Sequence, residues 1–173
     1  MPIGAKTNLK MQTPGQNSEA LNELYASLSP DAVETLRQHE TRKAVPAKTK
    51  LIELGKRPDH LIMLSAGTVE VLLPSGEQAI VLSTAGPGKV FGLRALVSGE
   101  SPQIEVICRT ECGLRLLPAQ LFTRVLRSHP QMYFAVAKLL SADLQLAQAY
   151  LKERSRRKLR AGDRQMLVSS DRA

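Results

Sequence analysis

The sequence AGPGKVFGLRALVSGESPQIEVIC, residues 85–108, decides the fold of this chain. It begins with two glycines two residues apart, and the pair Phe91-Gly92 follows. A short apolar turn comes next, then the Gly-Glu-Ser-Pro turn of residues 99–102, and then the strand-like sequence IEVIC. Gly92 and the small Ala95 would let backbone amides point into a pocket, which is how a protein binds an oxyanion without charged side chains. The stretch therefore predicts a phosphate-binding loop ahead of a strand.

Short apolar or alternating segments surround this stretch. Glycines from Gly55 to Gly86 punctuate them at intervals of 12, 9 and 10 residues. Short strands with turn signals at that interval indicate an all-β sandwich or barrel. The sequence Pro-Ser-Gly-Glu at residues 74–77 predicts a hairpin turn between two of them. The expected strands are residues 49–54, 61–64, 69–73, 79–83, 104–108 and 114–117.

Apolar residues at helical spacing flank this β region on both sides. Before it, residues 18–28 form one expected helix, and Ser29-Pro30 starts a second with an N-cap followed by proline at the first helical position. After it, Pro118 opens a short helix that a Ser-His-Pro sequence interrupts. Residues 131–154 then form the longest expected element. The fold class that follows is mainly β with flanking helices.

The domain is expected to span residues 18–155. Residues 1–17 are polar and broken by prolines and glycines, so we expect a disordered lead-in. Residues 156–173 are expected to form a flexible basic tail. Of the formal net charge of +8, residues 152–164 carry +5, from seven basic and two acidic side chains, which leaves +3 elsewhere. The basicity of the chain therefore belongs mainly to this C-terminal segment.

The order helix, eight-stranded roll, short helix and long helix resembles cyclic nucleotide-binding domains over about residues 20–155. The sequences that carry the resemblance are LIELGKRPDHLIMLSAGTVEVLL (51–73), AGPGKVFG (85–92) and LRLLPAQLFTRVLRSHPQM (114–132). They are most similar to the sensor domains of CRP/FNR-type bacterial regulators. The resemblance implies a double-stranded β-helix, a jelly-roll-like β-roll, with N-terminal helices and a long C-terminal helix. It also implies a regulatory protein of signal transduction.

The resemblance further implies a ligand site that binds a cyclic nucleotide or a related phosphate compound. Members of the family have a glutamate after Phe-Gly that holds the ribose 2′-hydroxyl, and an arginine nine residues later that pairs with the cyclic phosphate. Here Leu93 and Pro102 stand in those places. A lost charge-assisted hydrogen bond, about 1.5–3 kcal/mol, weakens binding by one to two orders of magnitude. We therefore expect weak binding of cyclic AMP or cyclic GMP.

The expected ligand-binding residues are Phe91, Gly92, Leu93, Arg94, Ala95, Pro102 and Gln103. Gln103 takes the arginine position if the alignment shifts by one residue, and it carries no charge. Pro102 also removes one backbone N–H from the loop. Arg94 either supplies a compensating charge or is a solvated side chain, and the sequence leaves both readings open.

The helix expected at residues 131–154 is apolar around most of its circumference, apart from one polar stripe at spacings of three and four. An apolar surface that broad usually covers both the domain's own core and a second subunit. Burial within its own domain is the alternative. We expect a homodimer through Val136, Leu140, Leu144, Ala147 and Leu151.

Other kinds of site have little support in the sequence. Cys108 and Cys112 are four residues apart, but the three histidines are scattered, so we expect two buried thiols and no metal site. No Ser-His-Asp, Cys-His or paired-carboxylate arrangement is recognisable, so we do not expect an enzyme or a certain cofactor. No run approaches the ~20 apolar residues of a membrane span, and the N-terminus lacks a secretory pattern, so we expect a cytoplasmic protein.

The basic tail could contact the phosphates of nucleic acid or acidic lipid, or it could be a solvated helix end. Related transcription factors carry a helix-turn-helix domain after the long helix, whereas about 20 residues remain here, so sequence-specific DNA binding is not expected. The leading hypothesis is a stand-alone regulatory or sensor module. The alternative is a ligand-free dimerisation or protein-interaction module with an unknown partner, and nucleic-acid binding through the tail is a third reading.

Overall fold

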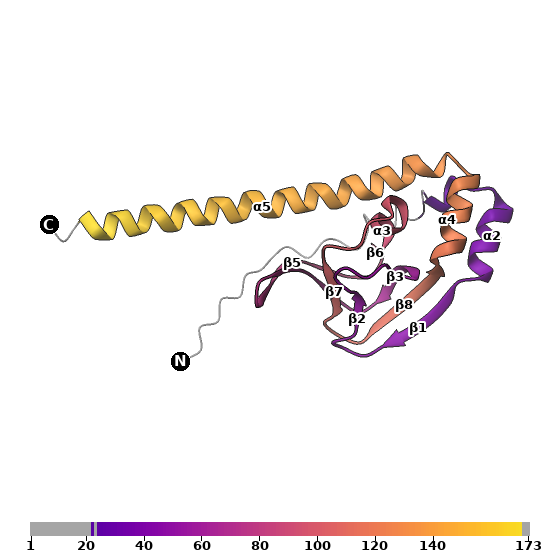
Figure 1. Cartoon of the computed structure of the whole chain (residues 1–173), viewed down its shortest axis with the longest axis horizontal. Coiled ribbons are helices and arrows are strands. Elements are labelled where there is room, and N and C mark those ends of the chain that lie inside the picture. The colour runs from indigo at the N-terminus through magenta and orange to yellow at the C-terminus, as the bar shows by residue number, and fades with distance from the viewer. Residues whose placement is uncertain (1–21, 23, 171–173) are drawn as a thin grey trace. The chain divides into compact units, whose positions relative to one another are not determined.

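The computed structural model describes residue 22 and residues 24–170, and it divides into two compact units, residues 1–139 and 140–173 (Figure 1). The division falls inside the domain predicted at residues 18–155. In the first unit, two four-stranded antiparallel sheets have the strand orders β1-β8-β3-β6 and β2-β7-β4-β5. The strands are β1 Thr41–Val45, β2 Lys50–Ile52, β3 His60–Ala66, β4 Val69–Ser75, β5 Gln78–Ala85, β6 Val90–Phe91, β7 Glu105–Cys108 and β8 Cys112–Pro118.

The mainly β class with flanking helices is confirmed, and each of the six expected strands is present, with its ends moved by a few residues. The hairpin expected at residues 74–77 joins β4 to β5, with Ser75 opposite Gln78 and Gly76 at φ +63°. The sequence patterns missed two strands, β1 and β6. In β1 only the last of five residues is buried, and β6 has two residues, so neither shows the alternation that predicts a strand.

The core lies between the two sheets and is built from the inward-facing side chains of both. Cys108 and Cys112 belong to it as free thiols, 1% and 0% exposed, which confirms the prediction of buried cysteines. Burial, followed by the hydrogen bond and charge of Cys112, raises the pKa of Cys108 to about 12. The other buried members of the core are Val45, Ile52, Ile62, Leu64, Val69, Ala85, Phe91, Val106 and Leu114.

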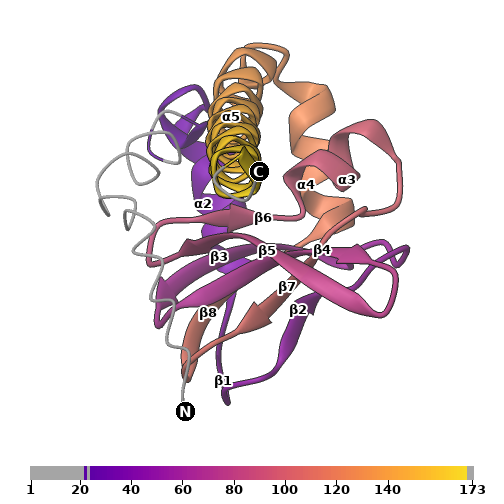
Figure 2. The same cartoon turned by 90° about the vertical axis from the view of Figure 1, so that its left-hand side faces the viewer.

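Helices cover one end of this roll. They are α2 Pro30–Gln38, α3 Leu93–Ser98 and α4 Ala119–Ser128, and α3 packs beside α4 (Figure 2). The expected N-cap is confirmed, because the Ser29 hydroxyl accepts a hydrogen bond from the Ala32 N–H at 3.3 Å. Of the helix expected at residues 18–28, residues 24–26 are helical and Leu24 is buried, and most of the remainder lies outside the described residues.

Helix α5, Met132–Ser170, begins where the long helix was expected but runs 39 residues. The predicted end near Arg154 is therefore corrected to Ser170, so residues 156–170 of the expected basic tail are helical. The flexibility expected of residues 156–173 stays a prediction. The pattern missed the extension because residues 154–165 are mostly charged and offer no apolar stripe. Among the described residues, none of the helices combines the length and apolarity that crossing a bilayer requires. Residues 1–17, the expected lead-in, lie outside the described residues.

Candidate functional site

A cavity of about 120 Å³ opens beside α3 in the first unit. Of the seven ligand-binding residues predicted from the sequence, six line it, and the remaining one, Leu93, does not. The Leu93 side chain is 5% exposed, because it turns into the core from the first position of α3. The cavity is lined by Ile52, Phe91, Gly92, Arg94, Ala95, Glu100, Ser101, Pro102, Gln103, Ile104 and Val106.

Two glycines in the left-handed region set the length and position of α3. Gly92, at φ +88°, is its N-cap, and Gly99, at φ +76°, is its C-cap, with the Gly99 N–H donating to the Ala95 carbonyl at 3.0 Å. A Cβ at position 92 would lie 3.2 Å from the His60 carbonyl oxygen and 3.3 Å from Pro58 Cγ. Glycine is therefore required there both for its backbone conformation and for the close approach of the β2–β3 loop.

The loop after α3 is held to the rest of the roll at both its ends. The Arg57 guanidinium donates to the Gly99 carbonyl, and the Gly55 N–H donates to the Pro102 carbonyl at 2.9 Å. Both bonds come from the segment that follows β2. This wall of the cavity is thus held by one side-chain and one backbone hydrogen bond.

The chemistry of the lining is mostly apolar. Ile52, Phe91, Ile104 and Val106 supply its inner part, and all four come from strands or their ends. The first N–H groups of α3 have no acceptor within the helix, so they remain as donors that do not depend on side-chain charge. Pro102 adds no donor to them, because proline has no N–H. The cavity therefore keeps a backbone frame and lacks a buried charge.

The one cation in the lining is already paired. Arg94 Nη2 lies 2.9 Å from Glu100 Oε2, and the two side chains are 63% and 67% exposed. An exposed pair of this kind contributes roughly 0–1 kcal/mol, so it separates easily. The sequence left open whether Arg94 supplies a compensating charge at the site or is a solvated side chain. In the structure the residue lines the cavity, and its side chain is largely solvated.

The sequence patterns missed five residues of the lining. Three come from strands or their ends (Ile52, Ile104 and Val106), and two come from the turn after α3 (Glu100 and Ser101). The strand residues were read as core positions, because a period of two marks a buried face without showing which cavity that face borders. Glu100 and Ser101 were assigned to a turn. Among the described residues, no three His, Cys, Asp or Glu side chains are placed to hold a metal ion.

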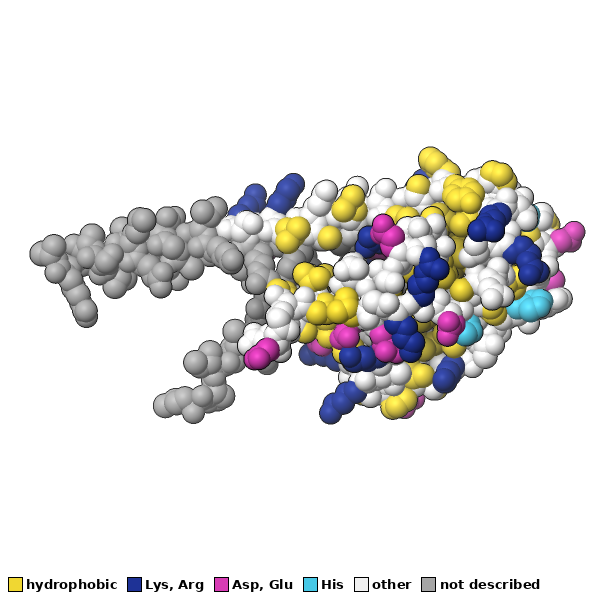
Figure 3. Space-filling model, in the orientation of Figure 1, with side chains coloured by type: hydrophobic (Ala, Val, Ile, Leu, Met, Phe, Trp, Pro, Cys, Tyr) yellow, Lys and Arg dark blue, Asp and Glu magenta, His cyan; other side chains and the backbone are white. Residues whose placement is uncertain are grey.

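The predicted dimer residues separate into two groups. Val136, 2% exposed, packs within the first unit together with Met132, Ala135 and Leu139, so it does not belong to an exposed stripe. The other four follow at spacings of four, three and four in the second unit: Leu140 half-buried, Leu144 59% exposed, Ala147 exposed and Leu151 60% exposed. Hydrophobic side chains are visible along the surface of α5 (Figure 3).

The sequence of this chain is similar to those of known proteins. The cyclic nucleotide-binding domain family matches residues 42–129, from the start of β1 to the end of α4, which is half of the chain. A cyclic nucleotide-gated potassium channel of Mesorhizobium japonicum is 27% identical over 109 residues, which are 63% of this chain and 29% of the channel. This chain therefore spans less than a third of that relative's length.

Solved structures show the same fold. The catabolite activator protein of Thermus thermophilus superposes with a TM-score of 0.62 at 22% identity, covering 76% of this chain and 62% of that one. A cyclic nucleotide-binding domain from Methylobacillus flagellatus superposes with a TM-score of 0.59 at 20% identity, covering 83% of each chain. Together with the family match, these findings show that the chain belongs to the cyclic nucleotide-binding domain family.

Proposed function

We propose that this chain is a regulatory module that senses a small ligand in the α3 cavity. The observation that carries the proposal is the convergence of six predicted residues on one cavity, behind a helix whose two glycine caps keep the backbone amides in place. Such amides favour a ligand with a phosphate or another oxyanion. Proteins of this family are regulatory rather than catalytic. This agrees with the sequence, in which no catalytic arrangement of residues is recognisable.

Cyclic AMP and cyclic GMP are expected to bind weakly, because both side chains that would recognise them are missing. Leu93 cannot accept a hydrogen bond from a ribose hydroxyl, and Pro102 cannot pair with a phosphate. Each loss is worth about 1.5–3 kcal/mol, or about 10- to 150-fold in affinity. The size of the α3 cavity also argues for weak nucleotide binding. A cavity of about 150 Å³ holds one benzene, and this one measures about 120 Å³. A whole nucleotide would project beyond it.

A thermal-shift screen against cyclic mononucleotides and cyclic dinucleotides tests the proposal. A ligand at 100 times its dissociation constant should stabilise the folded state by about 2.7 kcal/mol, which raises Tm by roughly 5–10 °C in a chain of this size. If no nucleotide at millimolar concentration moves Tm, a nucleotide sensor is excluded.

Charge variants locate the ligand. Gln103 lines the cavity and is exposed, so Gln103→Arg introduces a cation without burying it. We expect tighter nucleotide binding by Gln103→Arg and weaker binding by Gln103→Glu, the matched control of opposite charge. Leu93→Glu is a poorer test, because Leu93 is buried and a carboxylate there would be desolvated. Equal affinities for both Gln103 variants would place the ligand elsewhere.

A second candidate function, dimerisation, rests on the apolar stripe of α5. Leu144 and Leu151 are each about three-fifths exposed, and apolar residues at spacings of three and four form the seam of paired helices. We expect Leu140→Asp with Leu144→Asp to give a monomer in light scattering. Gln145→Asp with Gln148→Asp, on the polar stripe of the same helix, is the matched control and should leave a dimer intact. A dimer that survives the leucine changes has its interface elsewhere.

A further inference from the structure

A second cavity, of about 230 Å³, lies at the edge of the roll, away from the residues predicted to bind ligand. It is bordered by strands β1, β2, β3 and β8 and by the loop at residues 53–59, and it shares the side chain of Ile52 with the α3 cavity. It is about one and a half times as large as the ~150 Å³ cavity that binds benzene. The space is therefore enough for about nine buried heavy atoms, and a ligand with a polar headgroup can extend beyond them to the rim.

The floor of this cavity is apolar. Ile52, Ile62 and Leu114 are 4–7% exposed, and Val45 and Leu116 border them. The floor is reachable because β1 and β2 are the edge strands of their two sheets and leave the roll open between them. An apolar surface of this kind accepts a hydrocarbon chain.

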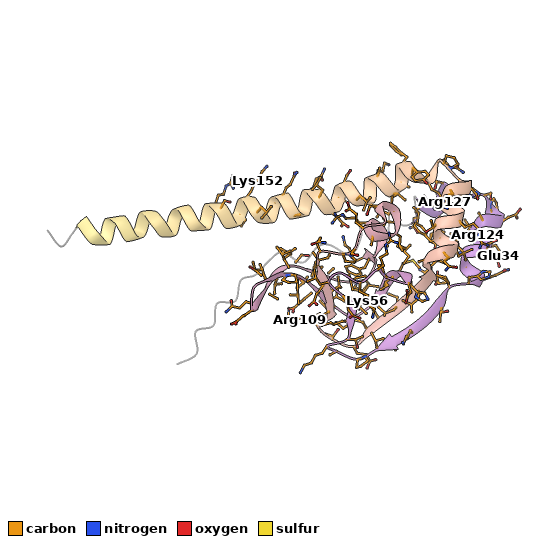
Figure 4. The ribbon with its side chains drawn as sticks, viewed as in Figure 1. Glu34, Lys56, Arg109, Arg124, Arg127 and Lys152 are labelled. Atoms are coloured by element: carbon orange, nitrogen blue, oxygen red, sulfur yellow. The ribbon has the colours of Figure 1, made fainter. Side chains whose placement is uncertain are left out.

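The rim of the cavity carries an excess of positive charge. Its cationic residues are Lys43, Lys50, Lys56 and Arg57, with His60 beside them, and its carboxylates are Glu53 and Asp59. Lys56 pairs with Glu53 at 3.1 Å, and Lys50 pairs with Glu105 at 2.9 Å (Figure 4 labels Lys56).

Lys43 differs from the other rim cations in its placement. In the β1–β8 pair it stands directly opposite Leu114, and residues that face each other across antiparallel strands share one face of the sheet. Its ammonium group is thus carried on the face that forms the cavity floor. Among the described residues, no carboxylate lies within ion-pair distance of Lys43. An inward charge also protects an edge strand from pairing with another chain, but that role does not require an open apolar floor beside it.

We propose that this cavity binds a small amphipathic carboxylate, such as a straight-chain fatty acid of six to eight carbons. The hydrocarbon chain lies on the floor between β1 and β2, and the carboxylate pairs with the Lys43 ammonium. Hydrophobic burial supplies most of the affinity, and the ion pair selects an anion over a neutral molecule with the same chain.

Isothermal titration calorimetry with three ligands tests the hydrocarbon chain and the carboxylate separately. Octanoate has the chain and the charge, octanol has the chain alone, and acetate has the charge alone. We expect octanoate to bind saturably, octanol to bind more weakly, and acetate not to bind at millimolar concentration. Cross-peak shifts of Ile62 and Leu114 methyl groups in octanoate titrations locate the chain, because these side chains line this cavity and not the α3 cavity.

Two variants on one strand test the carboxylate's partner. Lys43→Gln should weaken octanoate about fivefold, the factor expected for a partly exposed ion pair, and leave octanol unchanged. Arg42→Gln is the matched control, because neighbouring side chains in a strand point to opposite faces and Arg42 does not line the cavity. Both residues are exposed, so both variants should fold, which circular dichroism checks.

The proposal is overturned if octanoate does not bind, or if it binds no better than octanol and Lys43→Gln has no effect. It is also overturned if the shifts appear at Phe91 and Ile104, because those residues line the α3 cavity alone. Failure of the nucleotide screen leaves this outcome unaffected, since the two experiments address different residues.

Discussion

Gly67 is the position at which a single methyl group should cost this fold most. It joins β3 to β4 with φ +87°, a region that residues with a Cβ rarely adopt. A Cβ there would overlap the carbonyl oxygen of Glu111 and would lie 2.9 Å from Cys112 Cα and 2.8 Å from Cys112 Sγ. Two of these neighbours are backbone atoms and the third is fully buried, so none can move aside cheaply.

The cost of Gly67→Ala has two parts. The left-handed backbone costs about 1–2 kcal/mol, and the forced shift of β8 costs about 1–3 kcal/mol, as for other overpacked cores. We therefore expect a loss of about 2–5 kcal/mol in the free energy of unfolding, measured by urea denaturation at one fixed protein concentration. That is a large part of the 5–15 kcal/mol typical of a folded domain.

The matched control is Gly55→Ala. Gly55 has a similar φ of +73°, but a Cβ there would meet nothing within 4 Å, so only the backbone cost of about 1–2 kcal/mol applies. If Gly67→Ala costs no more than Gly55→Ala, the contact between the β3–β4 turn and the start of β8 does not limit this position, and the steric argument fails.

Three further outcomes follow from contacts described by the structure. Arg115 donates two hydrogen bonds, of 2.5 and 2.7 Å, to the carboxylate of Glu40, whose side chain is 7% exposed. Arg115→Gln should therefore lower the free energy of unfolding by about 2–3 kcal/mol in chemical denaturation, and Arg115→Lys should lower it less. The pKa of Cys108 is raised from 9.0 to about 12, so this thiol should resist alkylation at pH 8 in the folded chain. Its contribution to stability should be complete below pH 9 and should fall as the pH rises towards 12. Rapid modification of the native thiol would contradict this. Ser29→Ala should cost about 1 kcal/mol through loss of the helix cap, with a smaller loss for Ser29→Gly; an unchanged Tm would show that the cap contributes nothing.

The predictable parts of the fold are the strands whose pattern of apolar side chains matches a buried face. Strands β3 and β7 bury alternate or successive apolar residues, and glycines mark the turns between them. Strand β1 was missed because four of its five residues are exposed and two of these, Arg42 and Lys43, carry charge. It is held by pairing with β8 rather than by its own burial. Pairing with a strand that is distant in the sequence cannot be recognised from the pattern of neighbouring residues.

The candidate site was predictable as a loop and not as a cavity. The glycines around α3 and the residues between them are neighbours in the sequence, so their convergence could be expected. Ile52 and Val106 join them from strands that are far apart in the chain and meet only through sheet pairing. The burial of Leu93 was equally hidden, because the direction of the first side chain of a helix depends on how that helix packs.

Ile52 borders both cavities, so one side chain forms part of the wall of each. A substitution at this position that enlarges or narrows one cavity alters the wall of the other at the same time. The two cavities are therefore coupled at residue 52, and a variant made there to test ligand binding in one cavity has to be assayed in the other as well.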